Sequence, residues 1–89
     1  MKTIQRTSQF KKDVKRMGKC GKNFSIFKEI TRKLATGETL ETRYRDRLLV
    51  GQYKGTRECH IEPDWLLIYE VAESELVLIR TGTHVDLFR

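Results

Sequence analysis

The stretch from residue 57 to residue 71 restricts the fold more than any other part of the chain. It reads Arg-Glu-Cys-His-Ile-Glu-Pro-Asp-Trp-Leu-Leu-Ile-Tyr-Glu-Val, two strand-like segments with Pro63 and Asp64 between them. Proline fixes a backbone angle that turns use, and aspartate bonds to nearby backbone groups, so this dipeptide predicts a tight hairpin. Residues 65–71 are apolar on both faces, which is typical of a central strand.

A first helix is predicted upstream of this hairpin. Phe10, Val14 and Met17 recur at the spacing of one helical face, with lysines and arginines filling the other side. Thr7 or Ser8 can cap its N-terminus.

A second helix follows a glycine-containing turn, which makes the pair a helical hairpin. Asn23 or Ser25 can cap its start, and Gly37 suits its C-terminal end. Its apolar stripe is most simply explained as core, and consists of Phe24, Phe27, Ile30 and Leu34.

The remaining segments complete an α+β fold. Residues 2–6 predict an edge or side strand, residues 38–54 are irregular, polar and arginine-rich, and residues 76–79 are a third apolar strand after a turn at 72–74. We expect one domain over residues 1–89, with an N-terminal strand and the two-helix hairpin packed on one face of an antiparallel sheet.

Charge is distributed unevenly along the chain. Residues 1–36 hold eleven Lys/Arg and two acids, a net charge of +9, whereas residues 37–54 carry +1 and residues 55–89 carry −4, which add to the total of +6. A basic half on a small domain is typical of a protein that binds RNA, DNA or an acidic partner. A merely solvated lysine-rich face is the alternative.

Composition points to a soluble cytoplasmic protein. The two cysteines, Cys20 and Cys59, have no metal-ligand spacing and are expected to be reduced thiols. No apolar run approaches the roughly 20 residues of a membrane span, and the N-terminus lacks the apolar core of a signal peptide, so no membrane association is expected.

The turn assignments bring three polar side chains to one rim of the sheet. His60 precedes the hairpin turn and Asp64 lies in it. A turn centred near residue 73 sets Thr81 and Gly82 opposite Trp65 and Asp64, so His84 falls just past the strand end on the same rim. Strands lie about 4.8 Å apart, so His60, Asp64 and His84 can reach one bound phosphodiester.

Two imidazoles beside a phosphodiester favour acid–base cleavage of RNA. One takes the proton from a ribose 2′-OH, which attacks phosphorus, and the other protonates the leaving 5′-oxygen. Asp64 can orient one ring, and Arg80 or Lys54 can offset charge on the phosphate. No metal or other cofactor is required, and the spacing matches no recognised metal motif. Taken singly, each residue has an ordinary explanation, as a surface histidine, a turn former or a strand-end charge.

The C-terminal residues resemble a known family. Residues 57–69, then Arg80-Thr81-Gly82-Thr83-His84 and Leu87-Phe88, are similar to the YafQ branch of the RelE/ParE toxin superfamily. The resemblance covers nearly the whole chain, although the helices match only in character. It implies a type II toxin that cleaves mRNA in the ribosomal A site and is neutralised by a cognate antitoxin. It also implies catalytic roles for His60, Asp64 and His84, with Phe88 near the RNA.

The chain departs from this family at one position. YafQ-like toxins usually have an Asp-His-x-Leu-x-Gly stretch, and this chain has Arg47 in place of that histidine. Arginine can bind phosphate but cannot act as a base at neutral pH.

Three functions are compatible with these observations. The first is a ribosome-dependent endoribonuclease, with the 70S ribosome, ribosomal RNA and mRNA as partners. In that case the cations expected at the RNA are Arg43, Arg45, Arg47, Lys54, Arg57 and Arg80. The second is a ParE-like gyrase inhibitor, which the rim histidines disfavour. The third is a non-catalytic RNA-binding member of the fold, which Arg47 favours.

Overall fold

The computed structural model describes residues 1–88, the side chain of Gln52 excepted. Its elements follow one another as β1 (Thr3–Arg6), α1 (Ser8–Lys19), α2 (Ser25–Ala35), the 3-10 turn η1 (Thr42–Tyr44), β2 (Arg47–Leu48), the 3-10 turn η2 (Gly51–Tyr53), β3 (Arg57–Glu62), β4 (Trp65–Val71), β5 (Glu75–Gly82) and α3 (His84–Phe88). The predicted α+β architecture is confirmed. Short structured pieces occupy the region expected to be irregular, and α3 was not predicted.

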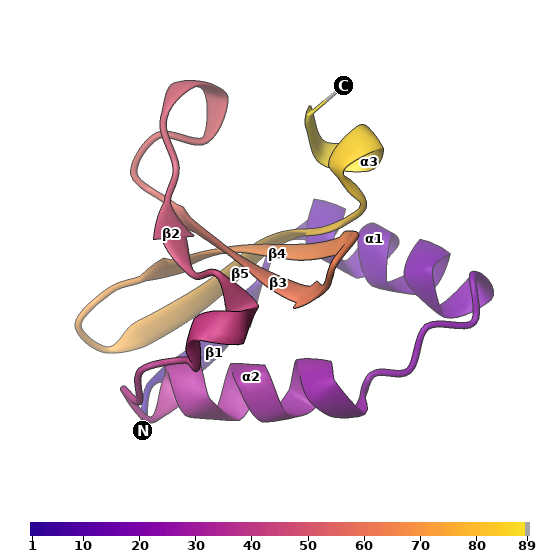
Figure 1. Cartoon of the computed structure of the whole chain (residues 1–89). Coiled ribbons are helices and arrows are strands. Elements are labelled where there is room, and N and C mark those ends of the chain that lie inside the picture. The colour runs from indigo at the N-terminus through magenta and orange to yellow at the C-terminus, as the bar shows by residue number, and fades with distance from the viewer. Residues whose placement is uncertain (89) are drawn as a thin grey trace.

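The five strands form one sheet in the order β1-β5-β4-β3-β2, so β4 is central as predicted (Figure 1). β2, β3, β4 and β5 pair antiparallel, but β1 pairs parallel to β5. The sequence predicts an edge or side strand here, and the parallel direction of its pairing was not predicted. After β1 the chain passes through both helices and then through β2, β3 and β4 before it returns beside β1 as β5. Such a long connection allows the two neighbouring strands to run parallel.

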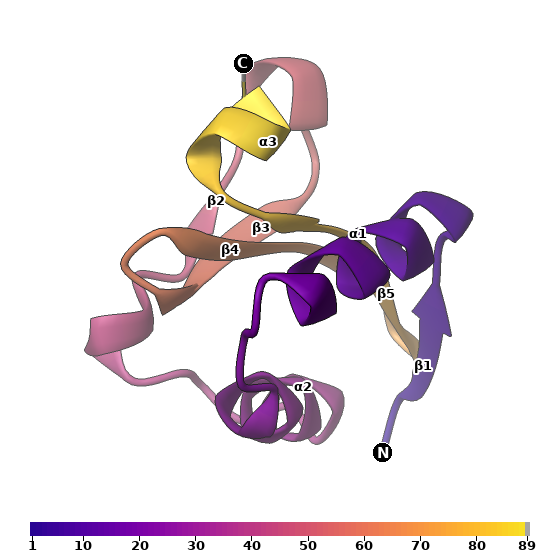
Figure 2. The same ribbon diagram turned by 90° about the vertical axis from the view of Figure 1, so that its right-hand side faces the viewer.

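Both long helices cover one face of the sheet (Figure 2). Thr7 caps α1, because its hydroxyl accepts a hydrogen bond from the Phe10 amide at 2.9 Å. At α2, Asn23 accepts from the Ser25 amide at 2.9 Å, and Gly37 ends the helix with a φ of 81°. The main core lies between these helices and the sheet, where Phe24 and Phe27 pack on the Trp65 ring.

A smaller core lies on the opposite face. It contains Leu49, Leu66, Ile68 and Leu87. In Figures 1 and 2 α3 and the segment that carries η2 rise from this face, away from the long helices. Both faces of β4 are therefore covered over residues 65–69, which explains why the strand is apolar on both sides up to the exposed Glu70.

The predicted register of β4 and β5 is wrong by two residues near the rim. Gly82 lies opposite Leu66 and Thr81 opposite Leu67, rather than opposite Asp64 and Trp65. An irregularity after Ile68 contributes to the shift, because a bulge adds one residue to one strand. A shift of two keeps each side chain on its predicted face.

Two sequence expectations concern the chemistry of the chain as a whole. Cys20 is exposed, Cys59 is buried, and both are free thiols as expected. Among the helices of residues 1–88, none is long and apolar enough to cross a membrane.

Candidate functional site

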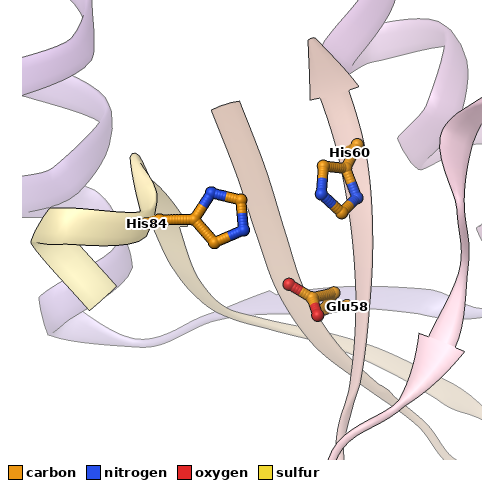
Figure 3. A group of neighbouring side chains, drawn as sticks. All are labelled: Glu58, His60 and His84. Carbon is orange, nitrogen blue, oxygen red and sulfur yellow. The ribbon is translucent and has the colours of Figure 1, made fainter. Parts of the chain in front are cut away.

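His60, Asp64 and His84 lie together at one rim of the sheet. The rings of His60 on β3 and His84 at the start of α3 are 5.6 Å apart between centroids (Figure 3). Asp64, in the hairpin turn, accepts a hydrogen bond from the His84 amide at 3.3 Å, and its Oδ1 is also 3.3 Å from His84 Nδ1. The structure thus brings together the three residues that the turn assignments grouped.

A fourth residue of this cluster, Glu58, was missed by sequence reasoning. It lies two residues before His60 on the same face of β3, and Figure 3 shows its carboxylate beside both imidazoles. The side chain is fully buried. Among the described residues, neither its Oε1 nor the buried Nδ1 of His60 has a hydrogen-bond partner. The two-residue spacing of Glu58 and His60 was the available signal, since it places both side chains on one face of a strand.

Arg47 provides the counter-charge for this buried acid. It lies opposite Glu58 in the β2–β3 pair, and its Nε is 2.6 Å from Glu58 Oε2. The Arg47 side chain is 66% exposed, so its guanidinium joins the buried carboxylate to the solvent-facing rim. The residue that replaces the family histidine thus belongs to the site, as a cation bound to Glu58.

The surroundings set the charge of the titrating groups. Burial lowers the pKa of His60; Glu58 opposes this, whereas His84, Arg45 and Arg47 lower it further. His60 is therefore mostly neutral at pH 7. The His84 amide and ring lower the pKa of Asp64, which keeps that exposed carboxylate ionised.

Phe88 closes the site on the side of α3. Its ring centroid is 6.2 Å from that of His84, and it meets the Tyr53 ring edge-on at 5.6 Å. Phe88 is 42% exposed, so part of its ring is accessible to solvent. The sequence expectation that places Phe88 near the RNA stays a prediction.

The predicted RNA-binding cations take different positions. Arg43 and Arg45 lie in and after η1, where they line a pocket together with His60. Lys54 is exposed directly after η2. None of these positions tests RNA binding, which stays a prediction.

Arg80 and Arg57 are already engaged in ion pairs. Arg80 lies opposite Ile68, on the histidine face, and its Nε is 2.8 Å from Asp13 Oδ2 on α1. The hydrogen bond with Asp13 raises the pKa of Arg80. Arg57 alternates with Glu58 and His60 and so faces the other way, where its Nε lies 3.3 Å from Asp46 Oδ1. The structure does not bring Arg57 to the rim.

The cluster also has the donor types of a transition-metal site. Glu58, His60 and His84 each offer one ligand atom, and these atoms lie within 4.8 Å of one another. Two imidazoles and a carboxylate form the protein ligand set of several zinc enzymes. The expectation of metal-independent chemistry is not tested by this geometry and stays a prediction.

Comparisons with known proteins point to one family. A profile of the family described as bacterial toxin of type II toxin–antitoxin system, YafQ, matches residues 2–89. The mRNA interferase toxin YafQ of Escherichia coli K12 is 40% identical over 86 residues, which cover 96% of this chain and 94% of the relative.

Solved structures agree with this assignment. The toxin in the E. coli DinJ–YafQ complex is 38% identical, with a TM-score of 0.92 over 100% of both chains. A metal-bound toxin from Helicobacter pylori is 39% identical, with a TM-score of 0.92 over 99% of this chain and 100% of that one. These proteins share both the fold and a substantial part of the sequence.

Proposed function

Because the chain belongs to the YafQ family of bacterial type II toxins, we propose that it is a ribosome-dependent endoribonuclease that cleaves mRNA in the A site. The coarser description, an mRNA interferase toxin, accords with its full-length relatives in E. coli. The observation that carries the proposal is the approach of the His60 and His84 rings to 5.6 Å, beside Asp64. The proposal takes residues 1–89 as one toxin domain.

In this mechanism His60 is the general base. Its lowered pKa leaves the ring neutral at pH 7, as a base must be to accept a proton from the ribose 2′-OH. The 2′-oxygen then forms a bond to phosphorus while the bond from phosphorus to the 5′-oxygen breaks. The products are a 2′,3′-cyclic phosphate and a 5′-hydroxyl.

His84 is the general acid, and Asp64 positions it. The ionised carboxylate beside Nδ1 favours a proton on that nitrogen and orients the ring, so that a protonated Nε2 can give its proton to the leaving 5′-oxygen. Phe88, whose ring is 6.2 Å from His84, supports a base next to the scissile bond.

Arg47 and Glu58 adjust the charge around the base. The buried Glu58 carboxylate stabilises the proton that His60 acquires, and Arg47 limits this effect while it is bound to Glu58. The exposed guanidinium of Arg47 can also contact the phosphate. An arginine is therefore useful at this position without acting as a base.

We propose that cleavage needs no metal, because two imidazoles supply both proton transfers. Metal binding is stated for a Helicobacter pylori relative, and in this chain Glu58, His60 and His84 lie close enough together to hold an ion. An ion held by both rings would occupy the lone pair with which His60 accepts a proton and would take the place of the proton that His84 donates. Cleavage should therefore survive EDTA once the ribosome's own Mg²⁺ requirement is controlled for.

The proposed partners are a cognate antitoxin, the ribosome and mRNA, all encountered in the cytoplasm. The E. coli relative has been solved as the DinJ–YafQ complex, which supports an antitoxin for this chain. A disordered acidic segment is a suitable inhibitor, because such a chain can wrap the basic surface and exclude RNA.

Single-turnover cleavage of a programmed ribosome tests the proposal. The parent protein should cut mRNA in the A site and leave a 5′-hydroxyl at the mapped end. His60→Ala and His84→Ala should each lose about 10²–10⁴-fold in the cleavage step, the usual contribution of a positioned acid or base. Asp64→Ala should lose less, because it acts through His84.

Ribosome binding, measured in parallel, should persist in all three variants. If both histidine variants are folded and cleave at the parent rate, the assignment of acid and base is wrong. A supercoiling assay with gyrase separates the toxin from a ParE-like inhibitor.

A further inference from the structure

A pocket lies beside the catalytic rim, at the edge of β3. β2 pairs only with Arg57 and Glu58, so the end of β3 lies beyond this pairing, and η1 contacts β3 there. The pocket has a volume of about 280 Å³ and its apolar lining includes Ile26 and Ile61. His60 forms part of its wall, so whatever occupies the pocket adjoins the group proposed to be the base.

Arg43 presents a flat, positively charged surface in this pocket. Its guanidinium carbon lies 4.8 Å from the centre of the Tyr44 ring, and its Nη2 donates to the Tyr44 hydroxyl at 2.8 Å. The Tyr44 side chain is buried, so this platform is anchored in the core. Glu41 lies 3.5 Å from Arg43 Nε, yet 67% of the Arg43 side chain stays exposed. The guanidinium is therefore held in place while one side stays accessible.

The backbone at the neighbouring residue is held in an unfavourable conformation. Arg45 has a φ of 47° and a ψ of 46°, the left-handed region, and among residues 1–88 it is the only residue other than glycine with a positive φ. Arg45 is the C-cap of η1, and non-glycine residues in this conformation are found more often at functional sites than elsewhere. Here it places a second cation in the pocket wall, near enough to lower the pKa of His60.

We propose that this pocket binds the nucleobase of the mRNA residue next to the scissile phosphate, stacked on Arg43, with Arg45 at the adjoining phosphate. The proposal rests on the function proposed above, which brings a single RNA strand to the rim. Proteins read single-stranded RNA by stacking its bases on aromatic rings or arginine planes. The occupant is a base rather than a protein segment, because the pocket is small, two arginines in its lining suit the charge of an RNA strand, and it shares His60 with the proposed cleavage site.

Glu62 refines this assignment. Its carboxylate also lines the pocket, but Lys22 Nζ lies 3.1 Å from its Oε1, so the pocket keeps the positive charge of its arginines. A carboxylate at the rim of a base pocket can accept hydrogen bonds from an exocyclic amino group. The pocket therefore has the groups needed to prefer some bases over others.

The first test measures binding without cleavage. Nucleoside 5′-monophosphates are titrated into the protein while the methyl resonances of Ile26 and Ile61 are followed by NMR. The proposal expects saturable shifts, abolished in Arg43→Ala and retained in Arg32→Ala. Arg32 is a matched control, since it is also exposed and also 3.5 Å from a glutamate, but lies outside the pocket lining.

Two outcomes of this titration would overturn the proposal. If inorganic phosphate alone produces the same methyl shifts, the pocket is an anion site and not a base site. If an acidic peptide shifts the methyl resonances and the nucleotides do not, the pocket serves a protein partner.

The second test uses ribosomes programmed with different A-site codons. Arg43→Ala should lose roughly 5- to 150-fold in cleavage of the preferred codon, the usual effect of removing one stacking partner, and should flatten the codon preference. Ile26→Trp, which fills the pocket, should likewise slow cleavage and flatten the codon preference. Val71→Trp should do neither, because Val71 is similarly exposed but lies at the end of β4 that is far from the rim.

An unchanged codon preference in both pocket variants contradicts the base-binding proposal. Failure of the parent protein to cut any programmed ribosome contradicts the proposed function instead, while the nucleotide titration still decides on the pocket.

Discussion

The imidazole of His60 lies between opposing charges, and this arrangement fixes how cleavage should depend on pH. With His60 as the proposed base, its lowered pKa should put the acid limb of the rate profile below pH 6.5, where this ring becomes protonated. Glu58 raises the pKa of His60 and Arg47 lowers it. Glu58→Gln should therefore move the acid limb to lower pH, and Arg47→Gln should move it to higher pH.

The measurement is the single-turnover rate between pH 5 and pH 8, paired with NMR titration of the His60 ring in each variant. A purely structural role for the Arg47–Glu58 pair would change the folded fraction and leave the titration midpoint in place. Shifts in the same direction for both substitutions would contradict the electrostatic account.

At the scale of elements, Asp13 joins α1 to β5. Its buried carboxylate accepts hydrogen bonds from Arg80 Nε at 2.8 Å, Arg16 at 2.9 Å and the Thr81 amide at 3.2 Å. Asp13→Ala leaves these donors without their acceptor, so we expect a loss of roughly 1–3 kcal/mol in the free energy of unfolding, measured with urea.

The same carboxylate should make stability depend on pH. Burial raises the pKa of Asp13, but hydrogen bonds from Arg80, Thr81 and their neighbours outweigh burial and leave it below 3.8. A carboxyl group whose pKa is lower in the folded state stabilises the protein at any pH above its pKa in the unfolded state. This stabilisation is lost as the pH falls through its pKa in the folded state. The advantage of the parent over Asp13→Asn should thus be constant above pH 5 and shrink below about pH 4. An advantage that grows on acidification would contradict this account.

Elements that depend on local signals were predictable, and those that depend on distant pairing were not. The hairpin turn and the bounds of β4 follow from Pro63, Asp64 and an apolar run. The parallel pairing of β1, the bulge after Ile68 and the short α3 depend on contacts across the whole sheet. The histidine pair was predictable because a two-residue register error preserves the face. Glu58 was missed because burial of an acid is not visible in an alternating pattern.

At the scale of the whole molecule, the basic helices should control docking. Residues 1–36 carry a net charge of +9, and Lys11, Lys12 and Lys15 are exposed on α1. Each phosphate contact adds roughly 0.7–0.9 to the steepness with which log affinity falls against log salt. Replacing these three lysines with glutamine should weaken ribosome binding and flatten this slope, whereas the triple arginine variant should keep it.

Affinity should be measured from low to physiological salt, with cleavage of saturated ribosomes as the control for an intact site. A parent affinity that does not change with salt would exclude this docking surface.

The parallel pairing of β1 with β5 has a consequence for synthesis. Residues 3–6, made early, bond to residues 75–78, made some seventy residues later. At the pace of translation, roughly 5–20 residues per second, the first strand must wait several seconds for its neighbour. Until then the nascent polypeptide has neither a complete sheet edge nor His84, which follows β5 directly. The histidine pair and the paired sheet edge can therefore form only after β5 and residue 84 have been made.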